Sequence, residues 1–387
     1  MGRGITKAIA IALIVGCALA LPFLLPSHPG DAVGSVYPLH SLAVNGGQRP
    51  APHTYTDSGP PLLFVDQEHV PGPGLLARAE VSGKVRLFGY EVARSTMPLY
   101  FAWVLRNTGT RPVAVTVTNH AAAPPGPRYL PLAASVQKAF LSGSASETFT
   151  IAPGRMDILR NRATTRAMFG QLAFSIYDLT MDGPLEAMDI ASANLVALGV
   201  SNLPSTYPGG WGVAALFPHD TRKLTITLSG RRNGMRIAGH DRDDPMMAAP
   251  NLATGARNVD EGNYGVTYKV RVIFPPSRTR RVIHLWVTAG ACALSADFLL
   301  RSGPLRGQVI QIPAVGSLPT GDMGAALTTL LLSPYRQSVF SFTLLPPAAS
   351  CTPLGVWEEP INPNSLAIRL YQIPARWWLA GREARQA

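Results

Sequence analysis

The sequence predicts an all-β protein built as two β-sandwich domains, jelly-roll-like or immunoglobulin-like, with one large interleaved sandwich as the alternative. Three observations support this prediction. The 387 residues include 36 Gly and 35 Pro without a collagen-like period, which is typical of short strands joined by tight turns. Hydrophobic residues reach 47% and charged residues only 15%, which excludes a disordered chain. Short β-branched and aromatic runs recur without alternating helical patterns, which favours sandwiches over an α/β fold.

The first half of the chain carries a clear series of strand patterns. Strands are expected at Lys84–Val92, Leu99–Arg106, Arg111–Asn119, Glu147–Ile151 and Leu172–Leu179. Val113, Val115 and Val117 alternate with Ala and Thr, the period-two pattern of a strand with one buried face. The connector at residues 107–110 reads Asn-Thr-Gly-Thr, which tolerates positive φ. The strands on either side of it are therefore predicted to pair with each other antiparallel.

One helix is predicted in this half, at residues 132–141. Leu132, Val136 and Phe140 share a face of such a helix, and Gly143 follows as a stop signal. Strand patterns continue after it. The further strands are expected at 195–198, 223–228, 264–274, 282–287, 308–312, 339–344 and 366–373.

The composition also divides the chain along its length. Residues 31–61 are rich in Pro, Gly, Ser and His and are predicted to form a spacer. Residues 202–212, with two Pro and three Gly, interrupt the strand pattern and mark a domain boundary. The predicted organisation is a leader, the spacer, two sandwich domains and a tail, at residues 1–30, 31–61, 62–202, 203–373 and 374–387.

The leader predicts export. Arg3 and Lys7 precede an apolar run at residues 8–25, the layout of a secretory signal. The run is also long enough to span a bilayer as an uncleaved anchor. Three processing routes stay open: retention as an anchor, cleavage after the Ala-x-Ala sequence at 18–20, or lipidation at Cys17 in a lipobox-like context. Each route places the body of the chain outside the cytoplasm, membrane-anchored or secreted at the cell surface.

Two cysteines lie beyond the leader, Cys292 and Cys351. In an oxidising compartment they could form a disulfide that closes a loop of about 60 residues, worth roughly 4 kcal/mol in the chain-entropy model. The alternative is two separate buried thiols. Neither has a partner at zinc-finger or Cys-x-x-Cys spacing, which argues against structural zinc and redox catalysis.

The charge balance indicates the kind of partner. The formal net charge is +11, from 34 Lys and Arg against 23 Asp and Glu. An exported protein meets little nucleic acid, so a polyanionic envelope polymer, a lipid surface or another surface protein is the expected partner. The densest basic run, Arg278 to Arg281, follows two prolines and is predicted to be a solvated hairpin end.

Four stretches carry a resemblance to a known group of proteins. They are residues 62–92, residues 105–119, the GPRYL sequence at 126–130 with the helix after it, and EGNYGVTYKVRV at 261–272. Together they resemble secreted proteins of Gram-positive bacteria often named for a copper amine oxidase N-terminal-like domain, over about residues 62–300. The resemblance implies a cell-surface β protein of uncharacterised activity. It does not imply an oxidase, because Asn263-Tyr264 is followed by Gly265 rather than an acid and the sequence has no His-x-His.

Candidate sites are few. The sequence contains no HExxH, GxSxG, P-loop or GxGxxG motif. Asp241, Asp243 and Asp244 could bind calcium through hard oxygen ligands, with Asp260 and Glu261 as additional ligands, although Arg242 opposes a cation. The alternative is a solvated acidic loop, and no other cofactor is expected.

Three further residues are candidates for ligand binding. Asn263 and Tyr264 could line a cleft, or could belong to a turn in which Gly262 and Gly265 take positive φ. Trp211 could stack on a sugar ring or pack onto a domain.

These observations lead to a functional hypothesis with two alternatives. The leading hypothesis is a non-enzymatic surface protein that binds an envelope polymer or another surface protein. One alternative is a secreted glycan hydrolase with a carboxylate pair in a sandwich cleft, for which Asp178, Asp182 and Glu186 are candidates near one hairpin. The other is a structural envelope spacer.

Overall fold

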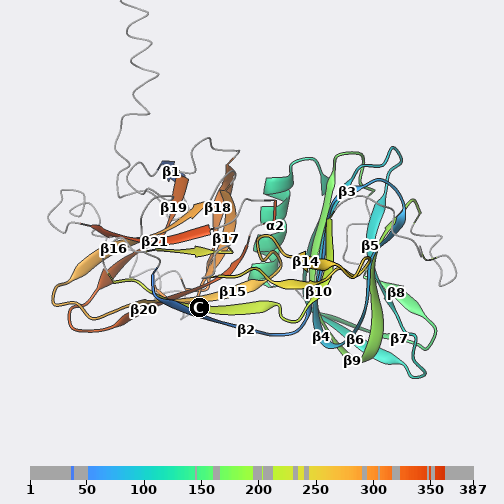
Figure 1. Cartoon of the computed structure of the whole chain (residues 1–387), viewed down its shortest axis with the longest axis horizontal. Helices are drawn as coiled ribbons and strands as arrows, with labels where there is room; N and C mark the ends of the chain where they lie inside the picture. Colours follow the sequence, from blue (N-terminus) through green and yellow to red (C-terminus); the bar gives the residue numbers. More distant parts are fainter. Residues whose placement is uncertain are drawn as a thin grey trace, which may run out of the picture.

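The computed structural model describes residues 36–38, 51–143, 146–159, 166–194, 203, 212–229, 234–238, 244–289, 294–303, 306–315, 323–346, 348–349 and 354–361. Strands form most of these residues, arranged in several sheets with a single described helix (Figure 1). The predicted all-β class is therefore confirmed.

The first part of the chain forms an eight-stranded sheet. Its strands are β3 (Leu62–Val70), β4 (Gly74–Ala93), β5 (Tyr100–Arg106), β6 (Val113–Gly126), β7 (Glu147–Ile151), β8 (Met156–Ile158), β9 (Leu172–Ser192) and β10 (Gly212–Phe217). The order is β10-β3-β4-β9-β5-β8, with β6 also on β9 and β7 on β6. The long ribbon of β4 and β9 has an irregularity between Val81 and Gly83. Both halves of the ribbon contribute to one buried cluster that includes Trp103 and Tyr177.

The predicted pairing across residues 107–110 is wrong. β5 pairs with the C-terminal half of β9, whereas β6 pairs with its N-terminal half, so the two strands do not pair with each other. Asn107 holds the connection instead of a two-residue turn. Its Nδ2 donates to the carbonyls of Arg111 and Ile151, both at 2.8 Å, and its Oδ1 accepts from the N–H of Gly109 at 2.9 Å. Because β9 is long enough to bind both strands at different places, this pairing replaces the local hairpin.

The second part forms two further sheets. The six-stranded sheet runs β18-β17-β20-β15-β11-β2, with β2 at His53–Ser58, β11 at Thr221–Thr227, β15 at Thr267–Phe274, β17 at Leu294–Leu300, β18 at Val309–Val315 and β20 at Ser338–Leu345. The five-stranded sheet runs β1-β19-β16-β21-β12, with β1 at Val36–Pro38, β12 at Gly234–Ile237, β16 at Arg281–Ala289, β19 at Met323–Leu332 and β21 at Leu354–Ile361. A short pair, β13 (Ala248–Pro250) and β14 (Arg257–Val259), forms a separate two-stranded sheet that contacts β10. Buried side chains of both large sheets belong to one cluster.

The helix α2 (Tyr129–Ser142) lies between the two parts of the molecule (Figure 1). It contains the predicted segment 132–141 and buries Val136 and Phe140. It contacts β6 and β9 of the eight-stranded sheet and β17 and β18 of the six-stranded sheet. Gln137 Nε2 donates to the carbonyl of Pro346 at 2.7 Å, which ties the helix to the end of β20.

Two strands pair across the predicted domain limits. β10, beyond residue 203, pairs with β3 in the eight-stranded sheet, and β2, inside the predicted spacer, pairs with β11. The largest core cluster also joins the two parts, because it includes Phe88 and Phe174 together with Tyr268 and Phe340. The division into two separate sandwich domains stays a prediction.

Several predictions fall outside the described residues. These are the leader at 1–30, the strands at 195–198 and 366–373 and the tail at 374–387. Within the described part of the chain, no helix combines the length and the hydropathy that a membrane crossing needs.

Candidate functional site

Asp244 belongs to a buried ion-pair network. Its Oδ1 accepts a hydrogen bond from Arg222 Nη1 at 2.6 Å, and its Oδ2 accepts from the Tyr268 hydroxyl at 2.8 Å and from the Ala238 N–H at 2.5 Å. Arg222 also donates to both carboxylate oxygens of Asp57, at 2.7 and 2.9 Å. Burial opposes the charge of Arg222, but the hydrogen bonds to Asp57 and the charge of Asp244 hold its pKa above the usual value. A cation at Asp244 would therefore have to displace Arg222.

Several other predicted site residues lie outside the part of the chain that the structure describes. Asp241 and Asp243 lie outside the described residues, as do Trp211, Cys292 and Cys351. The calcium site, the sugar-stacking residue and the disulfide therefore stay predictions. Among the residues that the structure does describe, no group of three or more His, Cys, Asp or Glu side chains is arranged to hold a metal ion.

Asn263 fixes the loop that leads into β15. The residue is fully buried at a φ of 48°, its Oδ1 accepts from the N–H of Met247 at 2.7 Å, and its Nδ2 donates to the Tyr268 hydroxyl at 2.7 Å. Every atom of the amide group that could meet a ligand is turned into the protein. These hydrogen bonds give Asn263 a structural role in the loop, and its binding role stays a prediction.

Tyr264 is half-buried and packs against the main core cluster. Its N–H donates to Asp260 Oδ1 at 2.9 Å. Gly262 and Gly265 on either side take φ values of 151° and 77°, which confirms the predicted turn. A Cβ at position 265 would lie 3.0 Å from Phe88 Cδ2, so this turn sits directly against the eight-stranded sheet.

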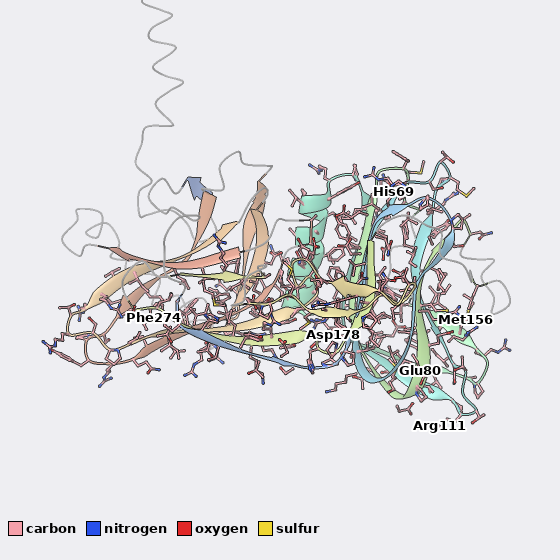
Figure 2. All side chains as sticks on the ribbon, in the orientation of Figure 1. His69, Glu80, Arg111, Met156, Asp178 and Phe274 are labelled. Atoms are coloured by element: carbon pink, nitrogen blue, oxygen red, sulfur yellow. The ribbon has the colours of Figure 1, made fainter. Side chains whose placement is uncertain are left out.

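Arg86 links the parts of the molecule at this turn. It donates to both oxygens of Asp178, from Nε at 2.7 Å and from Nη2 at 3.0 Å, and forms an ion pair with Asp220 Oδ2 at 3.1 Å. Its Nη1 donates to Thr267 Oγ1 at 2.7 Å and to the carbonyl of Gly265 at 3.0 Å. Figure 2 labels Asp178 where the eight-stranded sheet meets the second part of the chain. Two buried arginines, Arg86 and Arg222, thus neutralise the carboxylates around the junction.

The carboxylates proposed for glycan hydrolysis are engaged elsewhere. Asp178 pairs with Arg86, Asp182 Oδ1 accepts from a backbone N–H at 2.9 Å, and Glu186 forms ion pairs with Arg78 and Arg106 at 3.2 and 2.5 Å. They also do not lie near a hairpin. The Asp-Gly step at 182–183 lies inside β9, which continues through it without a hairpin turn. The pairing of β9 with β4 is interrupted at this step and resumes on both sides of it.

The half-buried Asp66 and the fully buried Asp260 are weak acids, and the sequence patterns did not single them out as a pair. Burial, with the nearby charge of Glu68, raises the pKa of Asp66 to about 7. Burial also raises the pKa of Asp260 well above its usual value, although the Tyr264 N–H opposes the shift. Asp66 Oδ1 and Asp260 Oδ2 have no hydrogen-bond partner among the described residues. Only the tertiary structure brings β3 and this loop together.

A second pair of carboxylates lines a small cavity within the eight-stranded sheet. The cavity has a volume of about 110 Å³, with Glu147, Asp157 and Tyr177 among its lining residues. Its other walls are Val117, Phe149, Ile158 and Leu159. Glu147 is exposed, Asp157 half-buried and Tyr177 fully buried. The space admits a few water molecules rather than a sugar ring.

A set of exposed cations lies at one end of the second part of the chain. Residues 275–280 connect β15 to β16, and residues 333–337 connect β19 to β20. Both connections pass from one sheet to the other at the same end, because Phe274 pairs with Ser338 and Arg281 with Leu332. The N–H of Tyr335 donates to the carbonyl of Ser277 at 2.7 Å and locks the two connections together. We call these two connections the basic end; Figure 2 labels Phe274 beside it, on the side away from α2.

The basic end presents exposed cations and an aromatic ring. Arg278, Arg280 and Arg336 are exposed, and within the described chain none of them forms an ion pair or a side-chain hydrogen bond. Tyr335 is 75% exposed. Neither connection contains an acidic residue. Such an arrangement attracts anions and offers a ring for stacking.

Further cations continue from the basic end along the outer face of the six-stranded sheet. Arg271 and Lys269 alternate along β15 with the buried Val270 and Val272, so both point outward, and Lys223 lies opposite Lys269 on β11. All three cations are exposed. The sequence shows the run at 278–281, but the neighbouring Arg336 and Lys223 come from distant segments.

Comparisons with known proteins add no function. No family model and no curated protein matches the chain. Among solved structures, the chain is similar to the CUB1-EGF-CUB2 domain of human MASP-1/3, at 9% identity and a TM-score of 0.18 over 80% of this chain and 99% of that one. It is also similar to Lac15 from a marine microbial metagenome, at 13% identity and a TM-score of 0.11 over 75% of this chain and 60% of that one. Fet3p, a multicopper oxidase that functions in iron import, matches at 10% identity and a TM-score of 0.12, over 68% and 51%. At these scores the likenesses carry no argument about this chain.

Proposed function

We propose that this chain is an exported surface protein that binds a polyanionic envelope polymer through the basic end and performs no catalysis. The observation that carries the proposal is a set of three guanidinium groups beside the exposed ring of Tyr335. They belong to Arg278, Arg280 and Arg336 and have no partner among the residues that the structure describes. Guanidinium groups bind phosphate and carboxylate through paired hydrogen bonds, which suits a repeating anion. The cations on β11 and β15 extend the surface, as a long polymer would require.

The proposal is tested by binding to a defined polyanion. The full chain is held in mild detergent, and its dissociation constant for inorganic polyphosphate is measured by fluorescence anisotropy, with retention on purified bacterial envelopes as a second readout. We expect the triple variant R278Q/R280Q/R336Q to bind polyphosphate at least roughly tenfold more weakly, and binding to weaken as salt screens the charges. Tyr335→Asn removes the ring but keeps a residue that tolerates positive φ, and it should reduce envelope retention.

A matched control separates the basic end from net charge alone. Arg155, Arg257 and Arg306 are exposed and lie elsewhere. R155Q/R257Q/R306Q therefore removes the same charge, and its dissociation constant should stay within about twofold of the unmodified chain. Equal loss in both variants, or no binding of polyphosphate or envelopes by the unmodified chain, would contradict the proposal. Retention on envelopes that protease treatment abolishes would instead indicate another surface protein as the partner.

The alternative is a glycan hydrolase, and the two carboxylates that line the cavity at Glu147 are its remaining candidates, although the cavity as described admits water and no sugar ring. Under this alternative, purified envelopes incubated with the chain would release soluble sugar, and Glu147→Gln would abolish the release. Under the binding proposal neither form releases sugar. Mass spectrometry of the supernatant distinguishes the two outcomes.

A further inference from the structure

Two loops at one end of the eight-stranded sheet expose large apolar side chains. Residues 94–99 connect β4 to β5, and residues 166–171 lead into β9. Met97, Met168 and Phe169 are 49%, 53% and 65% exposed. We call these residues the apolar tips. Most large apolar side chains of the described chain are buried, so three exposed ones on neighbouring loops mark an interaction surface.

The loops hold the apolar tips outward in a fixed geometry. Leu99 and Ala167 exchange two backbone hydrogen bonds, at 3.0 and 2.7 Å, and the N–H of Gly170 donates to the carbonyl of Ala93 at 2.8 Å. The N–H of Met168 donates to Gln171 Oε1 at 2.9 Å. Turning the apolar tips inward would break these backbone hydrogen bonds. The surface is therefore prepared for contact without a large ordering cost.

The charges beside the apolar tips favour an anionic lipid surface. The guanidinium of Arg94 lies 5.7 Å from the ring centre of Phe169, and that of Arg166 lies 5.7 Å from the ring centre of Tyr100. Neither loop contains an acidic residue. Exposed Phe and Met flanked by Arg is the composition of a membrane-surface contact, in which apolar groups enter the boundary of the acyl chains and cations meet headgroup phosphates.

The position of the loops agrees with this partner. The N–H of Arg94 donates to the carbonyl of Val70 at 2.8 Å, which places the loop beside His69, labelled at the upper end of the molecule in Figure 2. β1 lies on the same upper side in Figure 1. Ten residues separate the apolar run that ends at Leu25 from β1, and they span at most about 36 Å. A membrane that holds residues 8–25 would therefore lie within reach of this side.

We propose that the apolar tips dip into an anionic lipid membrane and hold the body of the protein against it. The proposal uses other residues than the basic end and does not rest on polymer binding. It does rest on residues 8–25 acting as a membrane segment.

The test is photo-crosslinking of the full chain in lipid vesicles. The vesicles contain phosphatidylglycerol and phosphatidylcholine, with a trace of a phospholipid that carries a diazirine on its acyl chain. After irradiation, mass spectrometry locates lipid adducts along the chain. We expect adducts in the peptides that contain Met97 and Met168-Phe169, in addition to those in residues 8–25. In vesicles of phosphatidylcholine alone, and in the variant R94E/R166E, the loop adducts should fall roughly tenfold.

A control variant and a defined contrary result keep the test decisive. L331S/V339S removes two exposed apolar side chains in the second part of the chain, 62% and 40% exposed, and should leave the loop adducts unchanged. Adducts confined to residues 8–25 in the unmodified chain would overturn the proposal. So would loop adducts that are equal in anionic and neutral vesicles, or a cross-link between the loops and a second copy of the chain.

Discussion

Arg222 and Asp244 form a buried ion pair with 2.6 Å between Nη1 and Oδ1, and each side chain is at most 2% exposed. The pair joins β11 to the segment that precedes β13. It gives one of the predicted calcium ligands a different partner, a guanidinium from a strand 22 residues earlier. This ion pair holds the segment against the sheet.

Removing this carboxylate should strongly destabilise the fold. Asp244→Ala leaves Arg222 buried with only Asp57 to balance it, and breaking a buried pair in this way typically costs about 3–5 kcal/mol. The expected result is a clear drop in the midpoint of urea unfolding followed by circular dichroism. Glu80→Gln, at an exposed position labelled in Figure 2, should change the free energy of unfolding by less than about 0.5 kcal/mol. Similar midpoints for the two variants would refute a stabilising role for the pair.

The burial of Asp297 should make the free energy of unfolding depend on pH. Burial raises its pKa to about 7, with Lys138 opposing the shift, and neither carboxyl oxygen has a hydrogen-bond partner in the described part of the chain. The unfolded-state pKa is about 3.9, so the native state holds a proton between about pH 4 and pH 7 that the unfolded state releases. The free energy of unfolding should therefore fall as the pH rises through this window and stay low above it.

Asp297→Asn should remove part of this slope. The amide stays neutral at every pH, so the variant should be more stable than the unmodified chain at pH 8 and similar to it at pH 4. Part of the slope should remain, because burial also raises the pKa of Asp66 to about 7. Thermal unfolding midpoints at pH 4, 6 and 8 test this, and an unchanged difference between the two proteins across the range would count against a buried, protonated Asp297.

Gly212 marks a close approach of two strands. A Cβ at this position would lie 2.2 Å from the backbone oxygen of Asp66, so Gly212→Ala forces β10 away from β3. We expect a loss on the order of 3 kcal/mol in the free energy of unfolding. A Cβ at Gly72 would meet no atom within 4 Å, and Gly72→Ala should be close to neutral. Equal unfolding midpoints in urea would show that β10 does not pair as described.

The geometry of the basic end leads us to expect that its two connections, which are far apart in the sequence, bind the polyanion together. Arg336 lies 56 residues after Arg280 but on the neighbouring connection. Arg336→Gln alone should weaken polyphosphate binding by roughly three- to tenfold, about as much as Arg280→Gln. Anisotropy titrations at low and physiological salt measure both effects. A variant of Arg336 with unchanged affinity would exclude the second connection from the binding surface.

Local patterns predicted some elements well and others badly. The helix at 132–141 and the strand at 113–117 follow periodicities that the structure keeps, because their apolar faces are the ones buried. The pairing of β5 with β6 was predicted wrongly, since a turn sequence cannot reveal that β9 binds each strand at a different place. The candidate site followed the same rule. The basic run at 278–281 is visible in the sequence. The sequence could not indicate the roles proposed for Arg336, Arg94 and Met97, because those roles depend on residues that only folding places beside them.

The sequence by itself determined the all-β class, the positions of most strands and the positive charge, because each depends on composition or on short-range periodicity. The tertiary structure alone decided which charges are neutralised. The half-buried Asp178 and the buried Asp244 pair with buried arginines from distant strands, while Arg278, Arg280 and Arg336 stay without a partner in the described chain. Burying a charge costs free energy unless an opposite charge pairs with it. Whether two opposite charges come together depends on strand pairing between segments that are far apart in the sequence.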